Sequence, residues 1–442
     1  MIENLQSVFS ASELETLARS TRFVQRTSRL GAETFLDLLV QDASSESGMS
    51  LLGYSNHLST VHGISVSAQG IDDRFNDYAV RFMRGLVSSV FSKQVAHRFD
   101  ASFLESYTSV CIFDSTKLEL PGRMRDDFPG FGGGASEAGI SIQYRYDLKN
   151  SVGCSLDVYP ATCSDSKYTE EISVRENSLE IFDLGYVSAP FLKRLDEGKS
   201  HYVCRLHSQA GVYDLSGNEL NLEEKYHWML KNRIPVYEQK VLVGQGEKRF
   251  ATRLIISLVD EQTYQKRLSK IEKDSHKKGY KVSDDYKVRL RLNLMLTNSD
   301  PQEIPASKVY LLYKFRWQVE LFFKSWKSSG WHLNKIKDVK YERYMCLLYA
   351  KLLMIILSDQ IYGIFAQKRY RQDKKLLSRF KCVKTLCQHI DLLRGLIDAS
   401  VYRIKEILDK IAILFSRGHI LCPRKDRMNY SELIDLFICK TK

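Results

Sequence analysis

The sequence predicts an α+β chain of several domains, in which a helical N-terminal domain and a helical C-terminal region flank an α/β core that a β-rich insertion interrupts. Apolar residues recur at helical intervals up to about residue 104, follow strand-like patterns from about residue 105, and return to helical spacing after about residue 304. A chain of 442 residues, 44% of them hydrophobic, is long enough for two to four domains with full cores. We expect the segments 1–104, 105–207, 208–304, 305–340 and 341–442.

The first segment is expected to be a helical DNA-binding domain. "ASELETLARSTRFVQR", "AETFLDLLVQDA" and "DRFNDYAVRFMRGLVSSVFSKQVAHRF" carry apolar residues three and four positions apart. Between them, "SLLGYSNHLSTVHGISVSAQGIDDRFN" predicts a helix, a turn at Gly63 and a second helix opened by Ser65 or Ser67. That pattern is typical of a DNA-reading helix-turn-helix, but any small helical bundle gives similar spacing, and both interpretations stay open.

The second segment predicts a mixed α/β sheet. "YTSVCIFDST" is an apolar strand that ends on Asp114, and "SLEIFDLGY" is another that ends on Asp183. "GISIQYRYDLKNSVGCSLDVYP" predicts a hairpin turning at residues 149–151, and the helix "SAPFLKRLDEG" and the strand "HYVCRLH" follow. Both aspartates are thus placed where strands end, which is where α/β sheets present functional groups.

Residues 208–304 are expected to form a β-rich insertion. "YEQKVLV", "RFATRLIISLVD" and "YKVRLRLNLMLTN" have strand patterns, and the basic stretch "YQKRLSKIEKDSHKKGYK" breaks them. The Gly-rich "PGFGGGAS" lacks the Lys-Ser/Thr ending of a nucleotide-binding loop, so we interpret it as a surface connection.

The stretch "YKFRWQVELFFKSWK", Tyr313 to Lys327, predicts a helix with two faces. At 100° per residue, its polar side chains fall within an arc of about 80°. The neighbouring arc holds Leu312, Phe315, Val319, Phe322, Phe323 and Trp326. The polar side chains of the first arc are Tyr313, Arg316, Glu320, Lys324 and Lys327. One face is therefore expected in the core, beside a narrow ionic stripe with a single carboxylate.

Asp114, Asp183 and Glu320 could meet at the edge of the sheet. Three clustered carboxylates repel one another unless cations lie between them. Hard oxygen ligands of this type suit Mg²⁺, and Mn²⁺ fits the same carboxylates. Two ions about 3.5 to 4 Å apart would stabilise the attacking and leaving oxygens of a phosphodiester.

These residues also carry a resemblance to a known family. The spacing of Tyr313, Arg316, Glu320 and Lys327 is similar to the YREK signature of insertion sequence 4 family transposases, which are cut-and-paste DDE enzymes. "FDST" and "DLGY" resemble the first and second aspartate motifs of that family, and "RFVQRTSRL" its opening segment. The resemblance implies a ribonuclease H-like core with an insertion between the second aspartate and the glutamate, for which the 137 positions from Asp183 to Glu320 leave room.

The resemblance further implies a role for each site residue. The three carboxylates would be catalytic and would bind two metal ions, Mg²⁺ with Mn²⁺ as a substitute, while Tyr313, Arg316 and Lys327, joined by Lys324, would hold DNA phosphates. The enzyme would bind double-stranded DNA at the terminal inverted repeats. It would cut, form and reopen hairpins and join target DNA, as a homodimer in the synaptic complex. Trp228 is the only Trp of the insertion and a candidate for stacking on a flipped base, although tyrosines there would serve as well.

Two alternatives stay open: a catalytically inactive, transposase-derived repressor, and a ribonuclease H-like nuclease that only hydrolyses DNA. Charge favours a nucleic acid partner, since residues 301–442 hold 28 Lys and Arg against 13 Asp and Glu, and the rest holds 37 against 40. The basic stretch Gln367 to Lys384 either contacts DNA or is a solvated helix face.

We expect no membrane partner and a location in the bacterial cytoplasm at the nucleoid. The longest apolar run, "CLLYAKLLMIILS", is broken by Lys351, and the acidic N-terminus lacks a signal pattern. Nine scattered cysteines without a CxxC pair are expected to be reduced and mostly buried, because the spacing of Cys382, Cys387 and His389 is loose for zinc.

Overall fold

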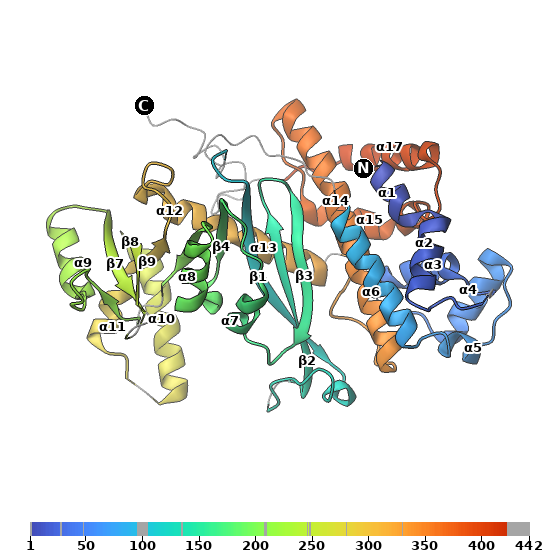
Figure 1. Ribbon diagram of the computed structural model, residues 1–442, viewed down its shortest axis with the longest axis horizontal. Coiled ribbons are helices and arrows are strands. Elements are labelled where there is room, and N and C mark those ends of the chain that lie inside the picture. Colours follow the sequence, from blue (N-terminus) through green and yellow to red (C-terminus); the bar gives the residue numbers. More distant parts are fainter. Residues whose placement is uncertain are drawn as a thin grey trace.

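One mixed sheet runs through the middle of the molecule. The computed structural model describes residues 2–26, 29–46, 48–94, 105–133, 136–206, 210–244, 246, 249–279, 281–328 and 330–421. The strands of the sheet are β1 (Ser109–Leu120), β2 (Ala138–Asp147), β3 (Val152–Pro160), β4 (Ser178–Phe182), β5 (His201–Arg205), β6 (Val212–Tyr213), β7 (Val236–Val243), β8 (Phe250–Leu258) and β9 (Leu292–Thr297). Their order is β3-β2-β1-β4-β5-β9-β8-β7-β6, with β1, β4 and β5 parallel and the other pairings antiparallel. Figure 1 shows the N-terminal and C-terminal helices on one side of β1–β3, and the helices of residues 222–289 at the other end of the sheet, beside β7–β9.

The N-terminal region is helical, as predicted. Its helices are α1 (Ile2–Phe9), α2 (Ala11–Ser20), α3 (Ala32–Ala43), α4 (Leu51–His62), α5 (Ala68–Asp72) and α6 (Asp77–Ser92). Gly63 ends α4 in the left-handed conformation, at φ 65°, and the hydroxyl of Ser67 caps α5 by accepting from Gly70 N. The predicted helix, turn and helix are present, but α5 has only 5 residues, which is short for an element that must lie in a DNA groove.

The first five strands confirm the mixed sheet of the core. The β2–β3 hairpin turns at residues 148–151, as expected, and helix α8 (Ala189–Glu197) joins β4 to β5. A short helix, α7 (Asp165–Tyr168), and three 3₁₀ turns, Gly122–Met124, Thr169–Glu171 and Leu184–Tyr186, complete this part. Successive residues of β1 face opposite layers: Ile112 packs with the helices of the two ends of the chain, and Phe113 packs with α8 and the insertion.

The strands of the insertion continue the same sheet, because β9 pairs with β5 and carries β8 and β7 with it. The insertion also contains helices that its strand-like patterns did not predict: α9 (Leu222–Lys231), α10 (Glu261–Lys278) and α11 (Asp284–Arg289). The strand expected over "YKVRLRLNLMLTN" was therefore wrong in its first half, since α11 ends at Arg289 and β9 begins only at Leu292. The basic stretch between the predicted strands is α10.

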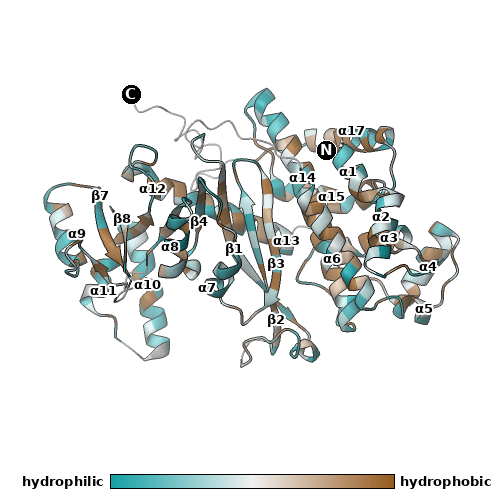
Figure 2. Ribbon diagram, viewed as in Figure 1, coloured by the Kyte–Doolittle hydropathy of each residue, from teal (hydrophilic) through white to brown (hydrophobic). Residues whose placement is uncertain are grey.

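After the insertion the chain is helical, as predicted. The helices are α12 (Ala306–Tyr313), α13 (Trp317–Ser328), α14 (Tyr341–Asp373), α15 (Arg379–Gln388), α16 (Ile390–Arg394) and α17 (Val401–Ser416). The apolar length of α14 would suffice to cross a membrane, but 83% of its most apolar window is buried inside the protein. Apolar residues of α14 and α6 belong to one hydrophobic core. Figure 2 shows brown, apolar stretches along α6. Its Lys351 is buried and donates to the carbonyl oxygens of Ala43 and Trp331, at 3.1 and 2.7 Å.

The N-terminal and C-terminal helices pack against each other. Arg394 of α16 donates to both carboxylate oxygens of Asp37 on α3, at 2.7 Å each, and His62 lies 2.8 Å from the same carboxylate. The backbone of Asp398 donates to Phe9 O. The two ends of the chain thus form one helical layer beside the sheet (Figure 1).

Candidate active site

The two aspartates lie side by side where β1 and β4 stop pairing. The parallel register ends with Phe113 opposite Phe182, so Asp114 and Asp183 are the next residues of the two strands. Both continue the face of Ile112 and Ile181, which packs toward α13. Asp183 follows the last residue of β4, as predicted.

The prediction that the first strand ends on Asp114 was wrong. β1 continues to Leu120, because beyond Phe113 it keeps its antiparallel pairing with β2 while it leaves β4. Asp114 therefore lies in the middle of a strand, and its Oδ1 accepts a 2.8 Å hydrogen bond from Ser115 N. Pairing with β2 fixes the backbone at Asp114. On its other side, toward Asp183, the strand has no pairing with β4 beyond Phe113.

The helix that was expected to run unbroken from Tyr313 to Lys327 is divided. α12 ends at Tyr313, a 3₁₀ turn covers Lys314–Arg316, and α13 starts at Trp317. The apolar face lies in the core as predicted: Phe322 packs edge-on against Tyr146, with ring centroids 4.7 Å apart, and Trp326 against Tyr144, at 4.9 Å. These contacts hold α13 against β2.

The polar side chains of these helices reach both aspartates. Tyr313 donates a 2.8 Å hydrogen bond to Asp183 Oδ1. Arg316 donates from Nη1 to Asp114 Oδ2, at 2.6 Å, and from Nη2 to Glu320 Oε1, at 2.5 Å. A single guanidinium thus bridges a strand carboxylate and a helix carboxylate. The three predicted carboxylates, Tyr313 and Arg316 meet at one edge of the sheet.

Burial and charge move the pKa values of the two aspartates in opposite directions. For Asp114, burial and the neighbouring carboxylates outweigh Arg316 and raise the pKa to about 6. For Asp183, burial would raise the pKa, but Arg316, the backbone of Leu184 and the hydroxyl of Tyr313 outweigh it and lower the pKa. Carboxyl groups with pKa values pushed apart are characteristic of functional sites.

The two lysines of the predicted signature differ. Lys327 donates to Lys117 O, at 2.9 Å, and burial lowers the pKa of its ammonium group. Lys324 is exposed, and among the described residues its side chain has no ion pair or hydrogen-bond partner. Its free ammonium group is available to an anion beside Glu320. Contact of these residues with DNA stays a prediction.

The donor chemistry of the site fits a hard divalent cation, since Asp114, Asp183 and Glu320 offer only carboxylate oxygens. The ligand atoms of these three carboxylates do not all lie within 4.8 Å of one another. In the described part of the chain, two other groups of His, Cys, Asp or Glu residues meet that distance. Arg316 stands between Asp114 and Glu320 and balances their charge. The guanidinium of Arg316 is therefore the counter-ion of these two carboxylates.

The two groups that do meet that distance have other partners. In the group of Asp37, His57 and His62, Arg394 already binds both carboxylate oxygens of Asp37. In the group of Cys111, Asp147 and Cys154, the aspartate accepts from one backbone N–H of β1 and two of the β2–β3 turn. Cys382 and Cys387 are buried free thiols and belong to neither group.

The structure divides the basic stretch Gln367 to Lys384 into the end of α14, a turn and the start of α15. Its Arg379 is internal: the side chain is 13% exposed, pairs with Asp359 at 2.7 Å and lies 3.6 Å from the ring centroid of Phe322. This arginine supports α13. Trp228, on α9, is 42% exposed and stacks edge-on against Tyr237 of β7, several strands away from β4.

We call the edge of the sheet where Asp114, Asp183 and Glu320 meet the catalytic edge. The sequence interpretation missed one cation there, Arg205. Phe182 pairs with Cys204, so Arg205 is placed beside Asp183 at the carboxyl ends of β4 and β5. It is exposed, and it contributes to lowering the pKa of Asp183. The available signal was its position near the end of the predicted strand "HYVCRLH", which a predicted helix joins to the strand that carries Asp183.

Comparisons with known proteins show which proteins this chain is similar to. Residues 105–357 match the family model described as the transposase DDE domain, a range that includes all three carboxylates. The transposase for insertion sequence element IS231F of Bacillus thuringiensis subsp. israelensis is 27% identical over 434 residues, which cover 94% of this chain and 90% of that relative. The transposase for insertion sequence element IS1151 of Clostridium perfringens is 26% identical over 450 residues, which cover 97% and 94%. This chain therefore belongs to the insertion sequence 4 family of DDE transposases.

Proposed function

We propose that this transposase binds the terminal inverted repeats of its own element and moves it by a cut-and-paste reaction with hairpin intermediates. The observation that carries this proposal is that Arg316 bridges Asp114 and Glu320. Beside them, at the same edge of the sheet, Tyr313 binds Asp183. A site of carboxylates with adjoining cations fits phosphoryl transfer, where negative charge must be held against bound metal. We also propose that it acts in the bacterial cytoplasm, at the nucleoid.

The reaction would consist of successive phosphoryl transfers. Water attacks a phosphodiester at the end of the element, which breaks the bond to the 3′-oxygen and leaves a 3′-hydroxyl. This hydroxyl attacks the phosphorus of the opposite strand, so a hairpin forms and the flanking DNA leaves with its own 3′-hydroxyl. Hydrolysis reopens the hairpin, and the freed 3′-hydroxyls attack target DNA. Each step forms one phosphorus–oxygen bond and breaks one, with loss of one proton from the nucleophile.

The side chains of the site have distinct tasks in this scheme. Asp114, Asp183 and Glu320 hold divalent ions, for which we propose two Mg²⁺ with Mn²⁺ as a substitute. Bound there, the ions stabilise charge on the attacking and leaving oxygens. Where bound cations balanced these carboxylates, the guanidinium of Arg316 would be free to bind a DNA phosphate with two hydrogen bonds. Tyr313 keeps Asp183 oriented through its hydroxyl.

We further propose that two copies act together, because both ends of the element must be held in one complex for coordinated excision. The basic stretch Gln367 to Lys384, which holds eight Lys and Arg against one Asp, supports contact with the DNA of such a complex. Lys324, unpaired and next to Glu320, supports contact near the cleavage point.

The test is excision of a marked element bounded by the repeats that flank the gene, with purified protein and Mg²⁺. Glu320→Gln keeps the size of the side chain and removes its charge, so the variant should bind the ends and leave them uncut. Glu119→Gln is the matched control: it removes an exposed carboxylate from the same strand as Asp114 and should leave excision unchanged.

Each other outcome selects a different conclusion. Cleavage by Glu320→Gln at the wild-type rate would refute the assignment of the carboxylates. Binding without cleavage by wild type would identify the inactive, repressor-like alternative. Nicked products without hairpins or joined DNA would identify a nuclease that only hydrolyses.

A further inference from the structure

Helix α10 of the insertion has two different faces. One is fixed to the sheet: Arg267 donates to the carbonyl oxygens of Leu290 and Leu292, at 3.0 and 3.1 Å, and the guanidinium of Arg291 lies 3.6 Å from the ring centroid of Tyr264. Tyr264 is buried. These contacts hold the first half of the helix in place and determine which side chains face outward.

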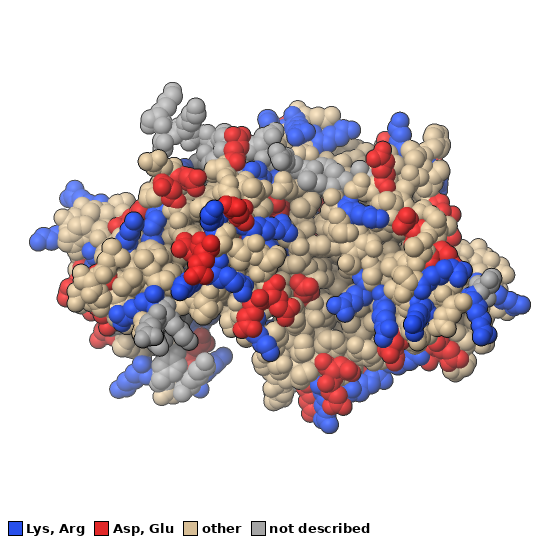
Figure 3. Space-filling view, in the orientation of Figure 1, with Lys and Arg blue, Asp and Glu red and all other residues tan. Residues whose placement is uncertain are grey.

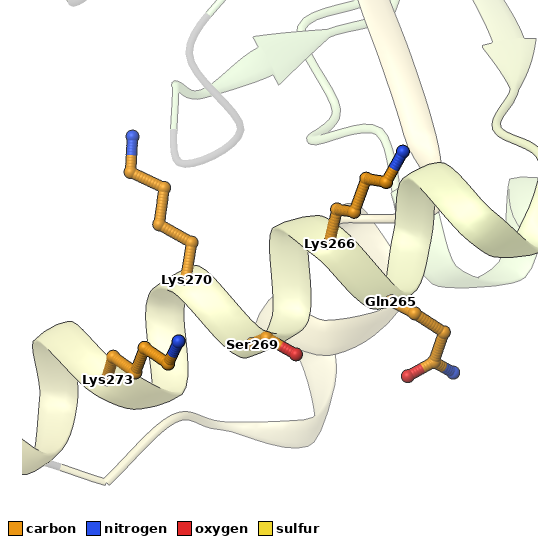
Figure 4. A pocket seen from close by; sticks show the side chains of 5 residues that line it. All are labelled: Gln265, Lys266, Ser269, Lys270 and Lys273. Atoms are coloured by element: carbon orange, nitrogen blue, oxygen red, sulfur yellow. The ribbon is translucent and has the colours of Figure 1, made fainter.

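The outward face carries a strip of lysines, which we call the lysine strip: Lys266, Lys270, Lys273 and Lys277. At 100° per residue they fall within an arc of about 60° and extend over about 16 Å of helix. All four are exposed, and among the described residues none has an ion pair or a hydrogen-bond partner for its side chain. Figure 4 shows Lys266, Lys270 and Lys273 extending from the helix, beside a shallow hollow that they line with Gln265 and Ser269.

The acidic residues of the same helix do not neutralise this strip. Glu261, at the first turn, pairs with Arg291 at 2.8 Å. Glu272 projects about 120° from the centre of the strip, and Asp274 lies at its margin. Like charges three and four residues apart on a helix repel one another, and an anion with several charges lying along the strip would remove that repulsion.

The lysine strip belongs to a basic path that starts at the catalytic edge. Arg205 is beside Asp183, as the pairing of β4 with β5 requires. Arg205 pairs with Met295 of β9, and Arg267 of α10 donates to Asn293 Oδ1 of the same strand, at 2.5 Å. Burial lowers the pKa of Arg267, and the charge of Arg205 is close enough to lower that pKa further. From Arg267 the path continues along α10. In Figure 3 the lower outline of the molecule is indented between the lobe that contains α10 and the lower end of the β1–β2 hairpin.

We propose that the lysine strip is a binding surface for the phosphates of double-stranded DNA that leads to the catalytic edge. A strip of about 16 Å corresponds to about five base pairs at 3.4 Å each. Lysine ammonium groups are point charges that hold phosphates and read no base, so this surface binds duplex of any sequence. The inference deepens the proposed function, because it takes DNA as the substrate of the site that Asp114, Asp183 and Glu320 form.

The experiment measures binding of a 40-base-pair duplex of arbitrary sequence to the full chain by fluorescence anisotropy, in EDTA, at several salt concentrations. The variant replaces all four lysines of the strip with Gln. Loss of four phosphate contacts should make the slope of log affinity against log salt shallower by about 3 to 4. Between about 50 and 200 mM salt, wild type should therefore lose about 100-fold more affinity than the variant.

Two controls test whether the effect depends on the positive charge of the strip and on its position on α10. Replacing the four lysines with Arg keeps the charge and should restore the wild-type slope. Arg403→Gln, Lys405→Gln and Lys410→Gln remove exposed cations of α17, at the other end of the molecule from α10 in Figure 1, and should leave the slope nearly unchanged. Circular dichroism of each variant checks that it is folded.

Binding and excision are read separately, so the two proposals fail in different ways. A Gln variant with the wild-type slope would overturn the proposal for α10, even where wild type excises its element. A wild type that binds through the strip but cuts nothing would refute the proposed function and leave the strip as a DNA-binding surface. An equal loss of slope in the α17 variant would show that net charge and not this surface governs binding.

Discussion

Replacing Asp114 with Asn tests whether burial or Arg316 dominates the electrostatics of the site. In the folded protein this carboxyl has a pKa of about 6, raised by burial from an ordinary value of 3.8. The folded state therefore binds more protons than the unfolded chain between these values. The stability that the group contributes is fully present below pH 3.8 and is lost as pH rises through 6.

The magnitude follows from the two pKa values. The complete transition corresponds to about 3 kcal/mol, of which about 1.4 kcal/mol falls between pH 5 and pH 8. Asn does not titrate, so the free energy of unfolding of Asp114→Asn relative to wild type should rise by about 1.4 kcal/mol over that interval. All other titrating groups are shared by the two proteins and largely cancel in the difference.

Urea unfolding in EDTA at several pH values measures this difference, with tryptophan fluorescence as the signal. Added Mg²⁺ should stabilise wild type more at pH 8 than at pH 5, because only the ionised carboxyl binds it, and should stabilise Asp114→Asn less. A difference that stays constant from pH 5 to 8 would refute the reasoning. That constant difference would mean that Arg316 outweighs burial, because a carboxyl with a folded-state pKa below 3.8 is ionised over the whole interval.

Two further changes test what supports the site. Arg379→Met should lower the free energy of unfolding by about 3 to 5 kcal/mol in urea titrations, because it leaves Asp359 buried without its partner, and adding Asp359→Leu should recover most of that loss. Tyr313→Phe should lower end cleavage by about tenfold and move the acidic limb of its pH profile upward, since one group that lowers the pKa of Asp183 is gone. Unchanged stability for Arg379→Met, or an unchanged cleavage profile for Tyr313→Phe, would contradict these roles.

The sequence predicted that Asp114, Asp183 and Glu320 would lie close together, but it predicted the wrong end for the strand that carries Asp114. An apolar run followed by Asp183 is a sufficient signal for a strand end, and the structure agrees. Asp114 follows a similar run, but β1 leaves one neighbour at Phe113 and keeps the other as far as Leu120. Pairing that differs on the two sides of a strand depends on residues far away along the chain, so the local pattern cannot show it.

Helix α10 was not predicted because its many charged residues obscure the helical spacing of its inward-facing residues. Tyr264, Leu268, Ile271 and Ser275 recur at helical intervals on the side that faces the protein. With lysines between them, the stretch looks like a break between strands. The 3₁₀ turn of Lys314–Arg316 left no such signal, since a change of pitch by one turn hardly alters which side chains share a face.

The continuous sheet explains how a site can be assembled from residues that the insertion separates. After Asp183 the chain runs through β5 and the insertion, and it returns along β9, which is antiparallel to β5 and in register with it. Buried Arg253 of β8 then binds the carbonyl oxygens of Ser299 and Ile304, in the loop that leads into α12. The start of α12, and with it Tyr313, is thereby tied to the strands of the insertion. A separately hinged insertion would have to be positioned anew for each reaction, whereas strands added to the same sheet bring Glu320 back to the aspartates as part of one rigid layer.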